Sequence, residues 1–169
     1  MIVAEQQSGD LESIFGACYG RLARVLYRVT GDTGRAEEIA SEAFWRLHRK
    51  PPRDRTNPEG WLYRTGLRLA LDQIKKDRRR AGYEALASVM GGAPSPEQAA
   101  ARNQERERVR HTLAALKVEQ VALILLRAEG FTYAEVAHRL QLNPASVGTL
   151  LARAEEAFRK EYVNRYGQP

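Results

Sequence analysis

This sequence of 169 residues predicts two small all-α domains joined by a flexible linker, on three observations. Apolar side chains recur at steps of three and four residues, which is the spacing of one face of an α-helix. The period-two alternation typical of strands is not found in the sequence. The helical pattern breaks where glycine and proline cluster, between Gly82 and Ala100. We therefore expect one domain over residues 1–81, a linker over 82–100 and a second domain over 101–169.

Three helices account for the first domain. The first is predicted to run from an N-cap at Asp10 to a stop at Gly31. Its apolar stripe consists of Leu11, Ile14, Phe15, Cys18, Leu22, Val25, Leu26 and Val29. The second begins near Thr33 and ends before Pro51. The segment 51–60 has the composition of a loop, and Asn57 then caps a third helix, with Pro58 at the first position, that runs to about Arg80.

The second domain begins with a helix that Ser95 and Pro96 open, and a turn at 117–119 leads into a helix over 121–128. The final two helices, 132–140 and 144 to about 162, fit a helix-turn-helix, with Leu142 as the apolar side chain of the turn. An ordinary helical hairpin is the alternative, and the sequence TYAEVA before the turn favours the motif. In such motifs the start of the second helix reaches base edges. The candidate DNA contacts are Tyr133, Asn143, Ser146, Thr149 and Arg153.

A basic run at 75–80 ends the third helix of the first domain. Its cations, with Arg64 and Arg68 upstream, are of the kind that position DNA through phosphate contacts. A solvated helix end explains one or two of these charges but not five in six residues. Trp61 and Tyr63 are candidates for stacking on unpaired bases, and for Trp61 we favour a place in the core. The cations of the run are Lys75, Lys76, Arg78, Arg79 and Arg80.

An acidic face on the second helix accompanies this basic run. Glu37, Glu38 and Glu42 lie opposite the apolar stripe of their helix. From spacing alone, a solvated face is the simpler interpretation. Acidic and basic surfaces within one short segment nevertheless suggest a module that grips a basic protein with one surface and DNA phosphate with the other.

Several function classes are disfavoured. His48, His111 and His138 have no metal-ligand spacing, and no phosphate-binding loop or nucleophile motif occurs, so we expect a protein that is not an enzyme and holds no cofactor or metal. Cys18 is the single cysteine, so no internal disulfide can form, and we expect it to fill the core. No apolar run approaches the roughly 20 residues of a membrane span, so we expect no membrane insertion and a cytoplasmic location.

Four stretches together resemble bacterial sigma factors of the sigma-70 family, in the compact extracytoplasmic-function (ECF) group. They are TGDTGRAEEIASEAFWRLHR at 30–49, WLYRTGLRLALDQIKKDRRR at 61–80, LAALKVEQVALILLRAEGFTYAEVAHRL at 113–140 and NPASVGTLLARAEEAFRKEY at 143–162. Their order and separation match region 2, linker and region 4 of that family. The resemblance implies an alternative sigma factor, which binds core RNA polymerase and directs it to promoter DNA.

The resemblance also implies roles for particular residues. The resemblance assigns core polymerase binding to Glu37, Glu38, Glu42, Phe44 and Trp45. The loop 51–60 and third helix would melt the −10 element and capture a flipped base, through Asn57, Trp61, Arg64, Arg68 and the five cations of the basic run. The helix-turn-helix candidates, including Tyr133, would read the −35 element. An anti-sigma protein that sequesters both domains is a further implied partner.

The reading helix departs from the family pattern. Gly148, Leu150, Ala152 and Glu155 stand where basic or histidine residues are usual. We expect weaker phosphate attraction and altered readout, since each good base contact is worth about 1–3 kcal/mol. An exposed Leu150 would instead suit a protein interface. Two alternatives therefore stay open: a stand-alone helix-turn-helix regulator, and a degenerate sigma-like adaptor that binds polymerase without reading promoters.

Overall fold

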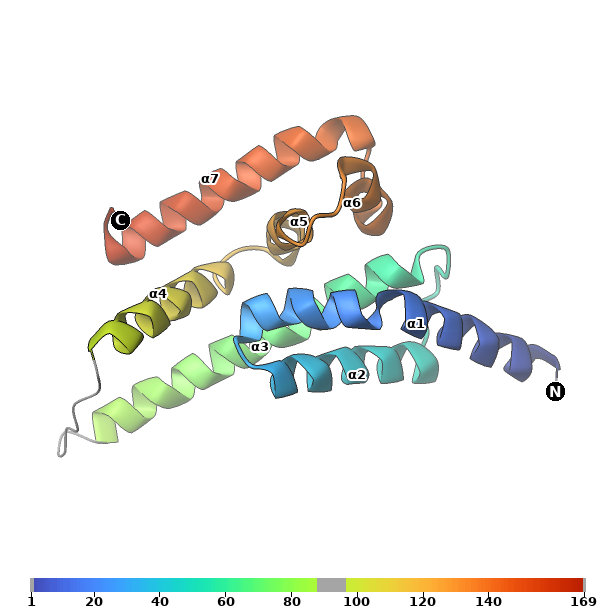
Figure 1. Ribbon diagram of the computed structural model, residues 1–169, viewed down its shortest axis with the longest axis horizontal. Helices are drawn as coiled ribbons and strands as arrows, with labels where there is room; N and C mark the ends of the chain where they lie inside the picture. Colours follow the sequence, from blue (N-terminus) through green and yellow to red (C-terminus); the bar gives the residue numbers. More distant parts are fainter. Residues whose placement is uncertain (1, 88–96, 169) are drawn as a thin grey trace.

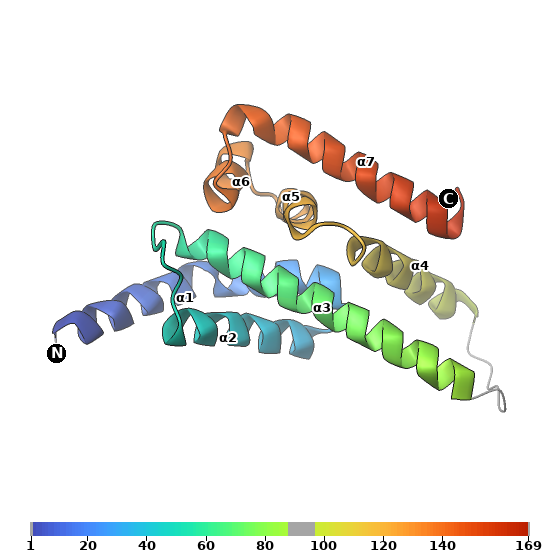
Figure 2. The ribbon, with the colours of Figure 1, turned by 180° about the vertical axis from the view of Figure 1, so that it is seen from behind.

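The computed structural model describes residues 2–87 and 97–168, with side chains at 11–82 and 103–168, and this part of the chain is helical without strands. The N-terminal half consists of α1 (Ile2–Thr30), α2 (Thr33–Arg49) and α3 (Pro58–Ala87). The C-terminal half consists of α4 (Glu97–Leu113), α5 (Val118–Ala128), α6 (Tyr133–Leu140), the 3₁₀ turn η1 (Pro144–Ser146) and α7 (Val147–Tyr166). Figures 1 and 2 show the C-terminal half lying over the N-terminal three-helix layer, with α7 outermost. The all-helical prediction is confirmed.

Short-range capping sets several boundaries where the sequence predicts them. Gly31 ends α1 with a left-handed φ of 69°, and its N–H donates to the Tyr27 carbonyl at 2.7 Å. The Asp32 side chain starts α2 by accepting a hydrogen bond from the Arg35 N–H at 2.7 Å. Asn57 Oδ1 starts α3 in the same way, accepting from the Gly60 N–H at 2.7 Å.

Two helices are longer than predicted. Helix α1 begins at Ile2, so Asp10 lies inside the helix and is not its N-cap. Helix α3 continues past Arg80 to Ala87 and α4 begins at Glu97, so regular structure occupies part of the predicted linker. Once a helix is nucleated, each added residue gains a hydrogen bond, and the alanines, glutamate and leucine over 81–87 are good helix formers. The rest of the predicted linker, 88–96, lies outside the described residues.

The core of the N-terminal half forms where α1 crosses α3. Leu22 and Leu26 of α1 are fully buried, as are Leu62 and Leu67 of α3. Cys18 belongs to the same core, where it is 2 % exposed, and burial raises the pKa of its thiol to about 12. The prediction that Cys18 fills the core is confirmed.

The two halves share one apolar core instead of meeting only through a linker. Tyr63 of α3 is completely buried and packs its ring edge-on against Phe131, which precedes α6, with ring centroids 5.8 Å apart. Buried side chains of α5, α6 and α7 continue the same cluster. Helix α4 also contacts the N-terminal half through Arg110. Its guanidinium lies so close to Gly31 that a Cβ atom on residue 31 would overlap it.

Replacing Asp32 with alanine removes the side-chain cap of α2. We expect Asp32→Ala to lower the free energy of unfolding by about 1 kcal/mol, because an N-terminal N–H of α2 loses its acceptor. Chemical denaturation monitored by circular dichroism measures this change. Asp32→Ser restores a capping oxygen and should stay within a few tenths of a kcal/mol of the original protein. Equal losses in both variants would contradict a capping role.

Candidate nucleic-acid and partner surfaces

A surface cavity of about 290 Å³ lies between α3 and the loop that precedes it, and we call it the α3 cavity. Its lining side chains are Pro52, Asp54, Asn57, Trp61, Arg64, Thr65, Arg68 and Gln141. Four of them are residues predicted for the −10 element, at 57, 61, 64 and 68. Steps of three and four residues place these four on one stripe of α3, so helical geometry brings them to one site. The cavity offers an aromatic ring and two guanidinium groups to a ligand.

The loop wall of this cavity is held by Asp54. Its carboxylate accepts hydrogen bonds from the Thr56 N–H at 2.9 Å and from the Thr56 hydroxyl at 2.6 Å. These hydrogen bonds stabilise the charged form and hold the pKa of Asp54 below its usual value. Pro51 and Pro52 restrict the backbone just before it. The loop therefore keeps a defined shape beside α3.

Both polar atoms of the Asn57 side-chain amide form hydrogen bonds. Besides capping α3, its amide donates to the carbonyl oxygens of His138 at 2.5 Å and Arg139 at 3.1 Å, and the residue is 7 % exposed. In this arrangement Asn57 holds the C-terminal half and does not face solvent. Trp61 is half-buried, packs against the core and lines the cavity. Tyr63 is completely buried, so its interpretation as a base-stacking residue is wrong.

The basic run follows along α3 and is exposed at all five of its cations. Three of them, Lys75, Lys76 and Arg79, line a groove of about 550 Å³ that α2 closes on its other side. The α2 wall of this groove carries Glu38 and Glu42. The acidic and basic sets therefore face a common groove instead of lying on opposite faces of the molecule. Across the two helices, Arg35 pairs with Asp77 at 2.6 Å, whereas Glu42 pairs with Arg46 of its own helix at 2.6 Å.

The α2 surface presents charge together with one exposed aromatic ring. Glu37 and Glu38 are exposed, and Trp45 is 52 % exposed with the Arg49 guanidinium 4.9 Å from its ring centroid. Phe44 is 5 % exposed, so it supports this surface from beneath and is not available for direct contact.

A second exposed aromatic ring lies on α1, at a position where the helical spacing predicts burial. Phe15 belongs to the predicted inward stripe of α1, but its side chain is 46 % exposed. It packs against the buried Phe44 with ring centroids 5.0 Å apart, and stacks on Tyr19 at 4.5 Å. The apolar stripe of α1 is wider than the face that its neighbours cover, and this is the reason that spacing alone assigned Phe15 to the core.

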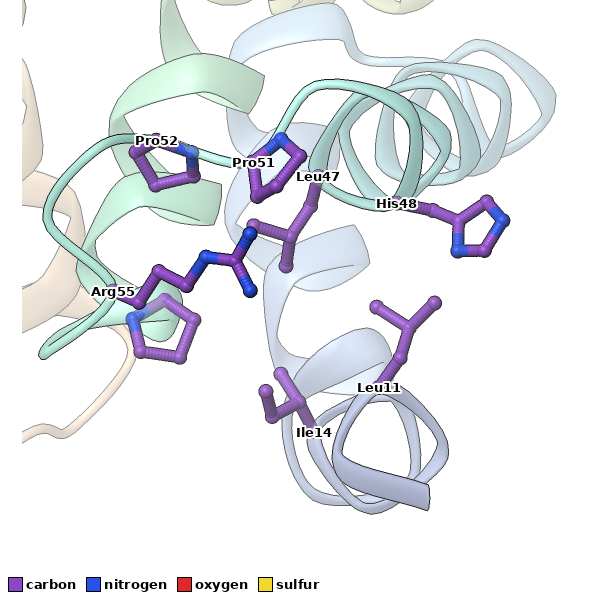
Figure 3. Close-up of a pocket in the computed structure, with 8 residues that line it drawn as sticks. Leu11, Ile14, Leu47, His48, Pro51, Pro52 and Arg55 are labelled. Atoms are coloured by element: carbon purple, nitrogen blue, oxygen red, sulfur yellow. The ribbon is translucent and has the colours of Figure 1, made fainter. Parts of the chain in front are cut away.

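An apolar pocket of about 150 Å³ opens on the other side of the same loop. Figure 3 shows Leu11 and Ile14 of α1 below it, with Leu47 and His48 at the end of α2 and the loop prolines above. Four of its lining residues, Pro51, Pro52, Arg55 and Pro58, belong to the loop 51–60, whereas none of the individually named candidates for DNA or polymerase contact lines it.

The helix-turn-helix has the predicted construction. Thr132 and Glu135 form a reciprocal capping box at the start of α6, with the Thr132 N–H donating to Glu135 Oε2 at 2.7 Å. Gln141 ends α6 in the left-handed region with φ 54°, and Asn143 caps η1 through the Ala145 N–H at 3.0 Å. A 3₁₀ turn therefore precedes α7, which begins at Val147 and not at Pro144.

The reading helix presents few polar contacts. Thr149 and Arg153 are exposed, and Ser146 is half-buried. Tyr133 is 45 % exposed, with the Arg127 guanidinium 4.9 Å from its ring centroid. Leu150 is half-buried against the core, which argues against its use as a free protein interface. Asn143 is exposed and retains one capping hydrogen bond.

Two regions of the chain match models of known protein families. The chain matches the family model of sigma-70 region 2 over residues 14–80 and that of sigma-70 region 4 over residues 106–158. The first region contains α2, the α3 cavity and the basic run, and the second contains the helix-turn-helix. Within the described residues, no helix combines the length and apolar character needed to cross a bilayer.

The curated proteins most similar in sequence to this chain include several named as sigma factors. The ferric citrate uptake sigma factor FecI of Escherichia coli (strain K12) is 28 % identical over 158 residues, which cover 89 % of this chain and 91 % of FecI. The ECF RNA polymerase sigma factor SigE of Mycolicibacterium smegmatis is 29 % identical over 86 % of this chain, which spans 58 % of SigE. Among solved structures, RpoE of Bartonella quintana, in complex with the anti-sigma factor NepR, aligns over 90 % of this chain and 96 % of RpoE with a TM-score of 0.44 and 18 % identity.

The ECF RNA polymerase sigma factor SigK of Mycobacterium ulcerans is 32 % identical over 148 residues, which cover 83 % of this chain and 75 % of SigK. The match to region 2, the match to region 4 and the identity to SigK together show that the chain belongs to the sigma-70 family of RNA polymerase sigma factors, in its extracytoplasmic-function group.

Proposed function

We propose that this chain is an alternative sigma factor that binds core RNA polymerase in the cytoplasm and directs it to promoters. The observation that carries the proposal is the α3 cavity, where Trp61, Arg64 and Arg68 line one hollow at the edge of an exposed basic run. An aromatic ring beside guanidinium groups suits an unpaired base and its phosphate. A basic helix end next to it suits the adjoining DNA backbone.

Promoter melting then follows from binding alone. Extruding a base from the duplex costs a few kcal/mol, and stacking one base on an aromatic side chain returns about 1–3 kcal/mol. Phosphate contacts from the exposed cations of α3 supply further free energy that does not depend on base identity. This scheme needs no hydrolysis and no nucleotide site, so we assign the chain a binding role and not a catalytic one.

The polymerase contact is assigned to the exposed face of α2. Glu37 and Glu38 offer negative charge, and Trp45 offers a large exposed ring of the kind that dominates protein interfaces. A basic, partly apolar surface on the polymerase is the complementary partner. An anti-sigma protein is a second expected partner, as the family relationship implies.

A polymerase-binding adaptor without promoter reading is the second candidate. It is favoured by the reading helix, where Arg153 is the one basic residue between positions 147 and 155. Reconstitution with core polymerase of the source organism separates the two functions. Run-off transcripts from genomic fragments should begin at discrete sites that share upstream elements. Stable association with polymerase but no initiation would establish the adaptor.

Reversing the charge of Glu38 tests the polymerase surface. We expect Glu38→Lys to weaken association with core polymerase by tenfold or more, on the order of 1.4 kcal/mol, because a cation replaces an exposed anion of the docking face. Co-purification and titration with labelled protein measure this loss. Glu119→Lys, at an exposed position on α5, carries the same charge change as a control. Unchanged association of the Glu38 variant would remove α2 from the interface.

Replacing Lys76 tests the basic run. For promoter DNA bound to the reconstituted holoenzyme, Lys76→Ala should reduce the slope of log K against log salt by about 0.7–0.9, because one phosphate contact is lost. The loss of affinity should be nearly the same for all promoter sequences. Lys117→Ala, which removes an exposed cation before α5, should leave the slope unchanged. A sequence-dependent loss at Lys76 would instead indicate base readout.

A further inference from the structure

A further cavity, of about 450 Å³, is lined by residues of α3, of α4 with the turn after it, and of the C-terminal end of α7. We call it the α7 cavity. Figures 1 and 2 show α4 between α3 and the end of α7, so segments far apart in the sequence contribute to one site. Its volume lies within the roughly 300–1,000 Å³ that is typical of small-molecule sites. The charged and polar side chains of its lining are Lys75, Arg78, His111, Glu161 and Arg165.

The charges around the α7 cavity do not balance. Lys75, Arg78 and Arg165 bring three positive charges, and Glu161 is the single carboxylate among the described lining residues. Glu161 already pairs with Arg165 on its own helix. Among the side chains that the structure describes, no carboxylate pairs with Lys75 or Arg78. Three positive charges against one negative charge leave the lining with an excess of two, even when His111 is neutral.

His111 experiences this positive potential directly. Burial lowers the pKa of its imidazole below the usual value. The cations Arg78, Arg110 and Arg165 lower this pKa further, because each disfavours another positive charge nearby. Glu107 opposes them from 3.6 Å, but it is also the partner of Arg110. An anion in the cavity would relieve this repulsion.

The charge and the donors of the site favour a phosphate group. A terminal phosphate carries about −1.5 to −2 charges at neutral pH, which matches the excess of the lining. Each phosphodiester of a DNA strand brings only one negative charge. Guanidinium groups bind phosphate oxygens in pairs, and a lysine ammonium binds them as a point charge. A small oligophosphate with a terminal phosphate therefore fits the cavity better than a DNA backbone.

We propose that the α7 cavity binds a small oligophosphate through Lys75, Arg78 and Arg165. The site does not rest on the proposed function, because its residues bind the anion without polymerase. It has a consequence for that function, since Lys75 and Arg78 are also candidates for phosphate contacts with DNA. The bound oligophosphate and DNA compete for these two cations.

Titration calorimetry of the full chain with sodium tripolyphosphate is the direct test. At an ionic strength of about 0.1 M, charges farther than about 10 Å from the ligand are largely screened. Arg165→Gln should weaken binding on the order of tenfold, because a charge-assisted contact is lost. Arg159→Gln is the matched control, since Arg159 lies on the same helix, pairs with Glu156 and does not line the cavity. No binding by the original protein, or equal losses in both variants, would overturn the proposal and leave the sigma-factor function untouched.

Glu161→Gln provides a test with the opposite sign. It removes the carboxylate of the lining and releases Arg165 from its pairing, so tripolyphosphate should bind severalfold more tightly. Glu156→Gln, which releases Arg159 outside the cavity, should leave the affinity unchanged. Damage to α7 cannot produce tighter binding, so this measurement decides the question even where Arg165→Gln fails to fold. Unchanged or weaker binding by Glu161→Gln would contradict the site.

The three histidines of the chain can locate the ligand, because His111 lines the cavity whereas His48 and His138 do not. In proton NMR, saturating tripolyphosphate should raise the pKa of His111, since an added anion favours the imidazolium, and should leave the other two titrations in place. Equal shifts of all three would indicate a general ionic effect and refute the assignment. The charged groups that face His111 are Arg35 of α2, Lys75, Asp77 and Arg78 of α3, Glu107 and Arg110 of α4, and Glu161 and Arg165 of α7.

A fluorescein-labelled single-stranded DNA of roughly 12 nucleotides distinguishes the oligophosphate site from a DNA surface. Arg165→Gln should bind this DNA as the original protein does, and displacing the DNA should require on the order of tenfold more tripolyphosphate. If Arg165→Gln weakens DNA binding as much as it weakens tripolyphosphate binding, the cavity belongs to the DNA surface and the proposal fails. Displacement at the same concentration in both proteins would refute competition at this site.

Discussion

Helix α3 must satisfy three neighbours at once, and the rest of the structure depends on how it does so. The inward side of α3 carries Leu62, Tyr63 and Leu67, of which Leu62 and Leu67 fill the core and Tyr63 packs against Phe131 of the C-terminal half. The opposite side carries Trp61, Arg64 and Arg68, which line the α3 cavity. The 3.6-residue period of a helix separates these two sides by angle, so a single element can hold the core, the interface and the proposed base site.

Sequence reasoning succeeded where structure depends on residues within about four positions. The glycine stop at Gly31 and the cap at Asn57 are signals of this kind, because the hydrogen-bonding partners lie in the same turn. The set Asn57, Trp61, Arg64 and Arg68 came from the family resemblance, and helical spacing explains why these positions share one side of α3. The same reasoning placed α1 too late, because favourable residues extend a helix beyond any single capping signal.

Contacts between distant segments were beyond this reasoning. Nothing in the local pattern marks Tyr63 for burial against Phe131, or Gln141 for a place beside Arg64, since these pairs are more than 60 residues apart. Asn57 illustrates the division within one side chain. Its oxygen serves the predicted local cap, whereas its amide donates across the interface to the last turn of α6.

The groove between α2 and α3 brings the acidic and basic side chains close together, so the two charged surfaces are not independent. Glu38 and Lys76 line opposite walls of one groove, so a partner on α2 and DNA on α3 would approach each other across it. Charges within a Debye length, about 8–10 Å at physiological salt, still act on one another. In the proposed assignment, the acidic wall would repel phosphate from the α2 side of the groove and favour a DNA path along the exposed end of α3.

The buried thiol of Cys18 bears on how the protein can be controlled. Thiolates, not thiols, react with peroxides and disulfides, and with a pKa of about 12 this group remains protonated at cellular pH. As the single cysteine of the chain, it has no resolving partner within the molecule. Peroxide attack on this thiol is therefore disfavoured in this structure, and a stimulus that acts through thiol oxidation is expected to be sensed by another protein.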